Sequence, residues 1–207
     1  MTIEDIQGAN EYPYENLAPG VFLYRNVFDP TGIKDMLEEE SSQDWPYLMW
    51  EMSGTDQGKI SNYRGSVEMH LGPISDEVQQ TNRLYAVSEK WKMAFSHINA
   101  CVHQYRQHWN LDLSSDEGYR VLKYPSGAEY RPHIDYHWEN KRQLSLVGWL
   151  SDDFVGGELY FGHLDLTVPC EAGSIILFPS NFVYRHSALP VEENSPYVKY
   201  SFVTWFS

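Results

Sequence analysis

A histidine and an aspartate stand two residues apart at His133 and Asp135. Side chains two apart on a strand project from the same face, so this pair can hold one metal ion without bending the backbone. A third ligand must come from elsewhere in the fold, and the candidate is His186 in the stretch Tyr184–Ser187. Two histidines and one carboxylate occupy one face of an octahedron and leave the opposite face open, as in non-haem Fe(II) oxygenases.

Other histidines compete with this assignment. The chain has 8 His, so a histidine two residues before an aspartate can also arise by chance. His137 lies on the same predicted strand face and is a rival to either histidine ligand, although a place in the pocket wall is the simpler interpretation. The remaining histidines have no carboxylate at this spacing and are expected to be solvent-exposed or packing residues: His70, His97, His103, His108 and His163.

The last strand of the sequence, Tyr197–Phe206, offers a cation. By alternation Lys199, Ser201, Val203 and Trp205 share one face. A lysine on a pocket face is costly unless it meets an anion. It would suit the far carboxylate of a dicarboxylate that chelates the metal, with the Ser201 hydroxyl as a second donor. The alternative, which stays open, places Lys199 on the outer, solvated face.

The elements that must position these residues are of two kinds. From Gly118 onward the hydrophobic pattern has a period of two, and turn signals such as Pro125–Gly127 and Gly156–Gly157 separate short strands. Regular short strands of this kind predict an antiparallel sandwich, barrel or jelly roll. We therefore expect an α+β protein that forms a single domain over residues 1–207, with helical and strand support in 1–117 and a β core in 118–207.

The N-terminal part carries the supporting elements. Met1–Gly20 is predicted to be irregular, Val21–Val27 to be a strand, and Asp29–Glu40 to be a helix with proline at its first position. Trp45–His70 is predicted to contain strand and loop. A long helix capped by Ser75 follows, and its apolar stripe repeats every seven residues at Leu84, Trp91, Ile98 and Tyr105.

Composition excludes several partners. The formal net charge is -14, and such a chain repels the phosphates of nucleic acid. A basic or neutral peptide, or a small molecule, is a better match. Cys101 and Cys170 lie far apart and form no metal or disulfide motif, which favours a reducing compartment. No secretory signal and no apolar run long enough for a bilayer is seen, so we expect a cytoplasmic protein without a membrane partner.

Taken in order, the motifs of the second half resemble those of one enzyme branch. They are Tyr124-x-x-Gly127-x-x-Tyr130-x-x-His133-x-Asp135, Gly156-Gly157-Glu158-Leu159, Gly173–Phe178, His186-x-x-x-Pro190 and Lys199-Tyr200-Ser201. This series is similar to the prolyl 4-hydroxylase-like branch of the 2-oxoglutarate/Fe(II) oxygenases. The resemblance covers Gly118 to Ser207, whereas the N-terminal half has no diagnostic motif.

The resemblance implies a double-stranded β-helix, or jelly roll, as the core. It implies that His133, Asp135 and His186 bind Fe(II), and that Lys199 binds the far carboxylate of 2-oxoglutarate. Tyr124 stands where this branch often has a tyrosine that hydrogen-bonds the cosubstrate. O2 is the second cosubstrate, and the resemblance also suggests ascorbate as a reductant.

The resemblance extends to the substrate groove. Arg142 and Trp205 match positions that line the peptide groove in some prolyl hydroxylases, and Tyr130 lies in the same motif series as the metal ligands. Tyr63 and Arg64 belong to a candidate lid, Ser61–Ser66, whose simpler interpretation is an ordinary surface loop. One departure is a longer segment between His186 and Lys199, and for this reason Arg185 and Arg131 are the alternative anchors.

We therefore expect hydroxylation of an unactivated C–H bond, with a prolyl residue of a peptide as the substrate. A second hypothesis keeps the chemistry and makes the substrate a free amino acid or another small molecule. A third makes the chain a non-catalytic, metal-binding jelly-roll module.

Overall fold

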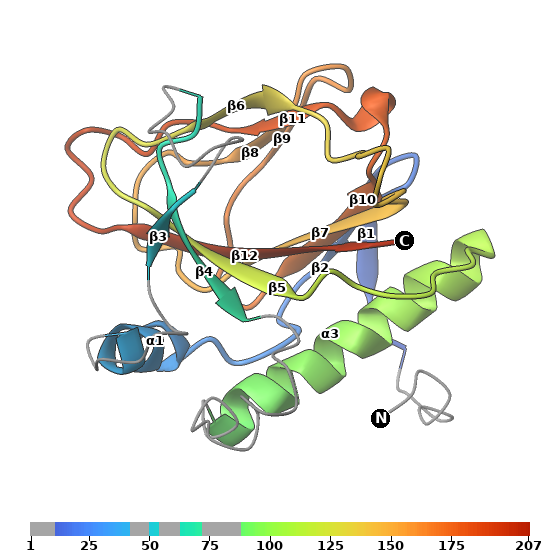
Figure 1. Ribbon diagram of the computed structural model, residues 1–207, viewed down its shortest axis with the longest axis horizontal. Helices are drawn as coiled ribbons and strands as arrows, with labels where there is room; N and C mark the ends of the chain where they lie inside the picture. Colours follow the sequence, from blue (N-terminus) through green and yellow to red (C-terminus); the bar gives the residue numbers. More distant parts are fainter. Residues whose placement is uncertain (1–10, 42–49, 54–62, 72–87) are drawn as a thin grey trace.

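The computed structural model describes residues 11–41, 50–53, 63–71 and 88–207. In these ranges the strands form two antiparallel sheets (Figure 1). The strands of the large sheet are, in order, β1 (Tyr14–Ala18), β2 (Val21–Tyr24), β10 (Ile175–Pro179), β7 (Leu144–Trp149), β12 (Lys199–Phe206), β5 (Tyr119–Tyr124), β4 (Val67–Leu71) and β3 (Glu51–Met52). Those of the small sheet are β6 (Tyr130–His133), β11 (His186–Ala188), β8 (Leu159–Phe161) and β9 (Leu166–Val168).

The described α-helices lie on one side of the large sheet, away from the small sheet (Figure 1). They are α1 (Ile33–Ser41) and α3 (Ser88–Trp109), and a short 3-10 helix, η3 (Phe182–Tyr184), precedes β11. The described part of the predicted stripe, Trp91, Ile98 and Tyr105, is buried in the core between α3 and this sheet. Ser75 and Leu84 lie outside the described residues. The arrangement is the predicted double-stranded β-helix with supporting helices.

The side chains of strand β12 point alternately to the two faces of the large sheet. Successive strand side chains face opposite ways, and the side chains of Tyr200, Phe202 and Phe206 pack in the core under α3. The alternate residues Lys199, Ser201, Val203 and Trp205 line the space between the sheets instead. The alternation predicted for this strand is therefore confirmed.

Three N-terminal boundaries differ from the prediction. Residues 14–18, expected to be irregular, form β1 because they pair with β2. The strand expected over 21–27 ends at Tyr24, and Asn26 then takes a positive φ of 52° that breaks the extended backbone. The Asp29 side chain accepts a hydrogen bond from the Thr31 amide at 2.9 Å, so it caps a turn, and the helix begins only at Ile33.

The described residues include both cysteines, and Cys101 and Cys170 are free thiols. In the same residues no helix combines the length and apolar character needed to cross a bilayer. The predicted strand and loop over 45–70 are described only in part, and that part contains β3 and most of β4. The division into one domain over 1–207 stays a prediction.

Replacing Gly148 with alanine is expected to destabilise the large sheet. Gly148 on β7 lies opposite Phe202 on β12, and an added Cβ would stand 2.2 Å from the Phe202 ring. Phe202 is fully buried, so the ring has no room to move. We expect a loss of about 1–3 kcal/mol or more in the free energy of unfolding, measured with urea. Gly162→Ala is the control, because its Cβ would meet nothing closer than 3.7 Å. Equal stabilities of the two variants would contradict this packing.

Candidate metal and cosubstrate site

The three predicted metal ligands meet where β6 and β11 pair. His133 ends β6, His186 begins β11, and the two residues are partners in the ladder. Asp135 lies two residues after His133, just beyond the end of β6, and its carboxylate lies beside both histidine rings. Its carboxylate oxygens lie 3.5 Å from Nε2 of His133 and 3.7 Å from Nε2 of His186. One ligand atom from each side chain lies within 4.8 Å of the other two.

Both imidazole rings are held in the orientation that coordination requires. Nδ1 of His133 lies 2.9 Å from the Arg131 carbonyl, and Nδ1 of His186 lies 3.0 Å from the Tyr184 carbonyl. A carbonyl only accepts, so each Nδ1 carries the proton and each Nε2 keeps a free lone pair. Metal-binding histidines are commonly fixed in this way by a backbone partner.

Charge also favours a metal at this point. Burial alone would raise the pKa of Asp135, but His186, His133 and the Ser145 hydroxyl outweigh it and hold that pKa well below its usual range. Burial lowers the pKa of His186, and the Asp135 carboxylate only partly opposes this. A charged carboxylate and a neutral imidazole are the forms that bind metal. The donor set, two nitrogens and one carboxylate, fits a divalent transition metal such as Fe(II).

These ligands open into a cavity of about 380 Å³ between the two sheets. Lys199 lies in its wall with 3% of its surface exposed. Its Nζ donates to the Gly157 carbonyl at 2.5 Å and lies 4.9 Å from the centre of the Tyr124 ring. In the part of the chain that the structure describes, no carboxylate forms an ion pair with it. A buried ammonium without a counter-charge is costly, so the site fits the far carboxylate of 2-oxoglutarate.

The residues predicted to contact the cosubstrate lie close to this lysine. Tyr124 is the ladder partner of Lys199, and Ser201 lies two residues further along β12 on the same face. All three line the cavity. The predicted pocket face of Lys199 is therefore observed, and the solvated alternative is wrong. The longer segment after His186 does not shift the lysine out of register.

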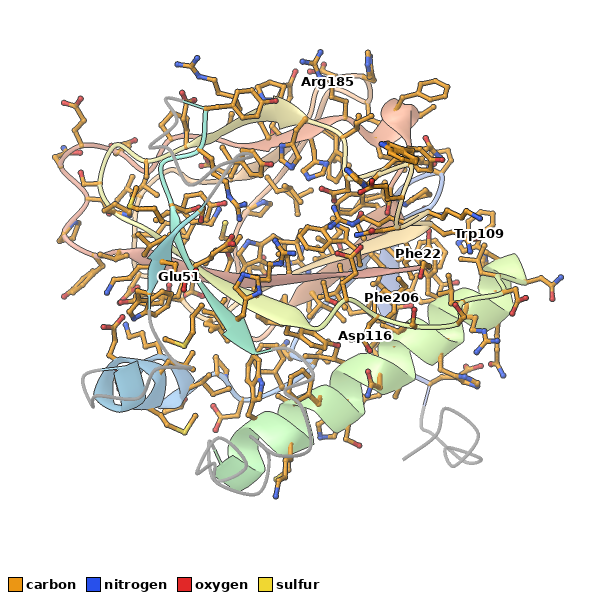
Figure 2. All side chains as sticks on the ribbon, viewed as in Figure 1. Phe22, Glu51, Trp109, Asp116, Arg185 and Phe206 are labelled. Carbon is orange, nitrogen blue, oxygen red and sulfur yellow. The ribbon has the colours of Figure 1, made fainter. Side chains whose placement is uncertain are left out.

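The alternative anchors lie elsewhere. Figure 2 shows Arg185 at the top of the view, on the outer side of the small sheet. Its guanidinium donates to the Pro132 carbonyl at 3.2 Å and is exposed. Arg131 pairs with Glu129 at 3.1 Å, and neither arginine lines the cavity that holds the metal ligands. His137 lines that cavity but does not belong to the three-residue cluster.

The predicted substrate residues fall into two groups. Arg142 and Trp205 line the cavity, and the guanidinium of Arg142 lies 3.9 Å from the centre of the Trp205 ring. Tyr130 also lines it, and its ring stacks on that of His133, a candidate metal ligand, with centroids 3.7 Å apart. The motif alone did not predict that the Tyr130 ring would stack on His133.

The described end of the candidate lid, residues 63–66, is not an ordinary surface loop. Arg64 is buried, pairs with Glu68 at 3.1 Å and lines the cavity. Tyr63 donates its hydroxyl to the Pro132 carbonyl at 2.8 Å and meets the Tyr130 ring edge-on. Ser61 and Asn62 lie outside the described residues.

Several supporting residues were not predicted from the sequence. The Ser145 hydroxyl helps to lower the pKa of Asp135 and lies 2.8 Å from the Ser180 hydroxyl. Glu117 holds Arg142 through two short contacts, 2.5 Å to Nε and 2.6 Å to Nη2. Arg120 also lines the cavity. Only Arg120 left a signal in the sequence, because it alternates with Leu122 and Tyr124 on the same strand.

Replacing Glu117 with glutamine is expected to lower stability in a pH-dependent way. Burial alone would raise the pKa of Glu117, but hydrogen bonds from Arg142 and Asn140 outweigh it and leave the pKa below its usual value. A carboxylate with a lowered pKa stabilises the fold above the ordinary value of about 4.3, and this contribution is lost as the pH falls through the folded value. We expect a loss of about 1–2 kcal/mol in urea unfolding near pH 7. The difference from the unmodified protein should shrink below about pH 4; a difference that does not change with pH would indicate lost packing instead.

Comparison with known proteins agrees with this geometry. Residues 119–207 match the family model described as the 2OG-Fe(II) oxygenase superfamily. No curated protein sequence matches the chain significantly. The matched segment contains the three candidate metal ligands, Lys199, and the strands of the small sheet.

Solved structures share the fold over most of the chain. A Pseudomonas putida prolyl-4-hydroxylase has 20% sequence identity and a TM-score of 0.68, with 90% of this chain and 92% of that chain covered. A prolyl hydroxylase from Trichoplax adhaerens, in complex with a hypoxia inducible factor peptide fragment, has 16% identity, a TM-score of 0.65 and coverages of 90% and 83%. The viral collagen prolyl hydroxylase of Paramecium Bursaria Chlorella virus-1 has 15% identity, a TM-score of 0.61 and coverages of 90% and 95%. At these identities the likeness establishes the fold, and the β core of residues 119–207 is the part of the chain that matches the model of the 2OG-Fe(II) oxygenase superfamily.

Proposed function

We propose that this oxygenase hydroxylates a prolyl residue in a peptide, with His133, Asp135 and His186 as the Fe(II) ligands and Lys199 as the anchor of 2-oxoglutarate. The observation that carries the proposal is the convergence of the three ligands in one cavity with a buried lysine that has no carboxylate partner among the described residues. The family match supports the chemistry.

The residues of the chain bind, orient and shield the reactants. Fe(II) supplies the activation of O2, and the overall reaction converts 2-oxoglutarate, O2 and a C–H bond to succinate, CO2 and a C–OH group. Lys199 neutralises the far carboxylate of the cosubstrate, beside the ring of Tyr124. The apolar wall near the ligands excludes water and comprises Val147, Trp149 and Leu159.

The peptide part of the proposal rests on the fold neighbours and on the surface beside the site. The neighbours are prolyl hydroxylases, and one holds a peptide fragment. Tyr136 and Trp138 follow the metal ligands in the chain and are exposed aromatic residues. Flat aromatic surfaces of this kind suit the proline rings of an extended peptide. We also propose ascorbate as the reductant that keeps the iron ferrous, and residues 1–207 as one domain.

Mass spectrometry tests this proposal. The protein loaded with Fe(II) is incubated with 2-oxoglutarate, ascorbate and short proline-containing peptides, and separately with free amino acids. We expect a mass gain of one oxygen on proline in the peptides, with one succinate formed per oxygen inserted. Reactions that lack Fe(II) or 2-oxoglutarate are the controls. A gain on free amino acids and none on peptides would make the peptide assignment wrong and leave the enzyme class intact.

A further inference from the structure

Three arginines form a second cationic group in the wall of the cavity: Arg64, Arg120 and Arg142. On the β5 and β12 ladder Arg120 lies four positions from Lys199. At about 3.3 Å per strand residue this is roughly 13 Å. A five-carbon dicarboxylate that spans from Lys199 to the metal ligands uses both of its carboxylates there and has none left for the arginine group. The arginine group is therefore left for another molecule.

Among the described residues, the three guanidinium groups form ion pairs with two carboxylates, those of Glu68 and Glu117. Arg142 is held by Glu117 at 2.5 Å, and Arg64 pairs with Glu68 at 3.1 Å. Arg120 has only a long contact of 3.9 Å to Glu68, and its Nε has no hydrogen-bond partner among the described residues. Its side chain is also the most exposed of the three, at 27% against 15% for Arg142 and 7% for Arg64. Arg120 is the least neutralised and most accessible cation of the group.

The surroundings of Arg120 make an incoming anion favourable. Burial lowers its pKa, Glu68 opposes this, and the charges of Arg142 and Arg64 lower it further. A guanidinium stays charged in proteins, so the charge must be balanced by a partner. Trp205 fixes its position, because the Arg120 guanidinium lies 5.2 Å from the centre of that ring.

We propose that Arg120 binds a carboxylate of the substrate, so that the prolyl residue to be hydroxylated carries or adjoins an acidic group. This inference rests on the proposed function and names its substrate class. A guanidinium can hold a carboxylate through two parallel hydrogen bonds, which adds selectivity to affinity. The chain as a whole has a net charge of -14, which disfavours acidic ligands at long range. The preference for an acidic substrate must therefore come from its direct contact with Arg120 inside the cavity.

The carboxylate has two possible sources that share this chemistry. It can be an acidic side chain next to the proline in a peptide, or the α-carboxylate of a C-terminal or free proline. The first set of probes is therefore a short peptide blocked at both ends, with glutamate, glutamine or lysine on either side of one proline. The second set is a dipeptide ending in proline, its amide, and free L-proline.

Two readouts are measured for each probe. One is the mass gain of one oxygen with the loaded enzyme, from which kcat and KM are obtained. The other is the dissociation constant on the metal-free protein, followed by tryptophan fluorescence because Trp205 lies beside Arg120. Loss of one charged hydrogen-bonding partner usually corresponds to about a tenfold change or more in affinity. We therefore expect the acidic probes of one set to bind roughly tenfold more tightly than their neutral partners.

Variants show whether the preference for acidic probes depends on Arg120. Arg120→Met keeps the length of the side chain and removes its charge, and should bring the ratio of acidic to neutral affinity close to one through KM. Arg120→Lys should restore part of the ratio. The matched control is Arg106→Met, because Arg106 is a similarly exposed arginine on α3 that pairs with Asp112. This variant should keep the ratio of acidic to neutral affinity of the unmodified protein.

The outcomes separate the two proposals. Equal affinity for acidic and neutral probes, no affinity for any acidic probe, or a preference that survives in Arg120→Met would overturn the carboxylate site, even if proline is hydroxylated. A preference that depends on Arg120, without any hydroxylation, would support the carboxylate site and count against the proposed function. The set that shows the preference identifies the source of the carboxylate.

Discussion

Replacing Asp135 with alanine is expected to abolish turnover of 2-oxoglutarate and to weaken metal binding by at least 10–100-fold. Loss of a residue that merely supports a metal ligand typically costs about this much, and Asp135 is a candidate ligand itself. Its carboxylate stands between the two Nε2 atoms, at 3.5 and 3.7 Å. Without it two neutral nitrogens remain. Metal content after dialysis and succinate formation are the two measurements.

The control for Asp135→Ala is Asp153→Ala, because Asp153 is partly exposed and pairs with Lys34 at 3.2 Å on the surface. The control should keep both metal and turnover. The Asp135 variant should remain folded by circular dichroism, since the change removes a buried charge that lies between two histidines. A variant that is folded and binds metal as tightly as the unmodified protein would show that the ligands lie elsewhere.

Replacing Lys199 with methionine is expected to raise the dissociation constant of 2-oxoglutarate by roughly 10–150-fold and to leave metal binding in place. A hydrogen bond to a charged group contributes about 1.5–3 kcal/mol. Lys199 is buried and lines the cavity beside Tyr124 and Ser201. Methionine preserves the volume of the side chain. Titration of the anaerobic, metal-loaded protein with 2-oxoglutarate gives this dissociation constant, and the KM for 2-oxoglutarate in succinate formation should rise with it.

Lys199→Arg tests whether charge alone suffices. The side chain packs closely against Gly157, where an added Cβ would lie 3.1 Å from the Lys199 Cδ. A larger guanidinium cannot take the same position, so we expect only partial recovery of affinity. If Lys199→Met binds 2-oxoglutarate normally, another cation anchors the cosubstrate, and the arginine group of Arg64, Arg120 and Arg142 becomes the alternative anchor.

Much of the site could be predicted because it depends on short periods. The alternation along β12 puts its side chains on one face whatever the tertiary structure. For His133 and Asp135 the two-residue spacing identified the right pair, although β6 ends at His133 and Asp135 lies just beyond the strand. The seven-residue repeat of α3 likewise identified the face that packs on the sheet at Trp91 and Ile98. The choice of His186 as the third ligand depended on the family resemblance as well.

What could not be predicted depends on contacts between distant segments. Residues 14–18 form a strand only because β2 lies beside them, and Ser145 touches Asp135 only because β7 lies behind the metal site. The pairing of Glu117 with Arg142 likewise has no local signal in the sequence. The weak pairing of Arg120 likewise follows only from the tertiary structure, in which Glu68 pairs more closely with Arg64 and Glu117 with Arg142.

We propose that His133, Asp135 and His186 bind Fe(II) in a cavity where Lys199 receives 2-oxoglutarate. The most direct test of this claim is anaerobic addition of Fe(II), then 2-oxoglutarate, to the metal-free protein, with Asp135→Ala alongside. We predict a weak visible charge-transfer band of a metal-chelated 2-oxoacid in the unmodified protein and none in the variant. Bound metal without a band on addition of 2-oxoglutarate, or a band that persists in Asp135→Ala, would contradict the claim.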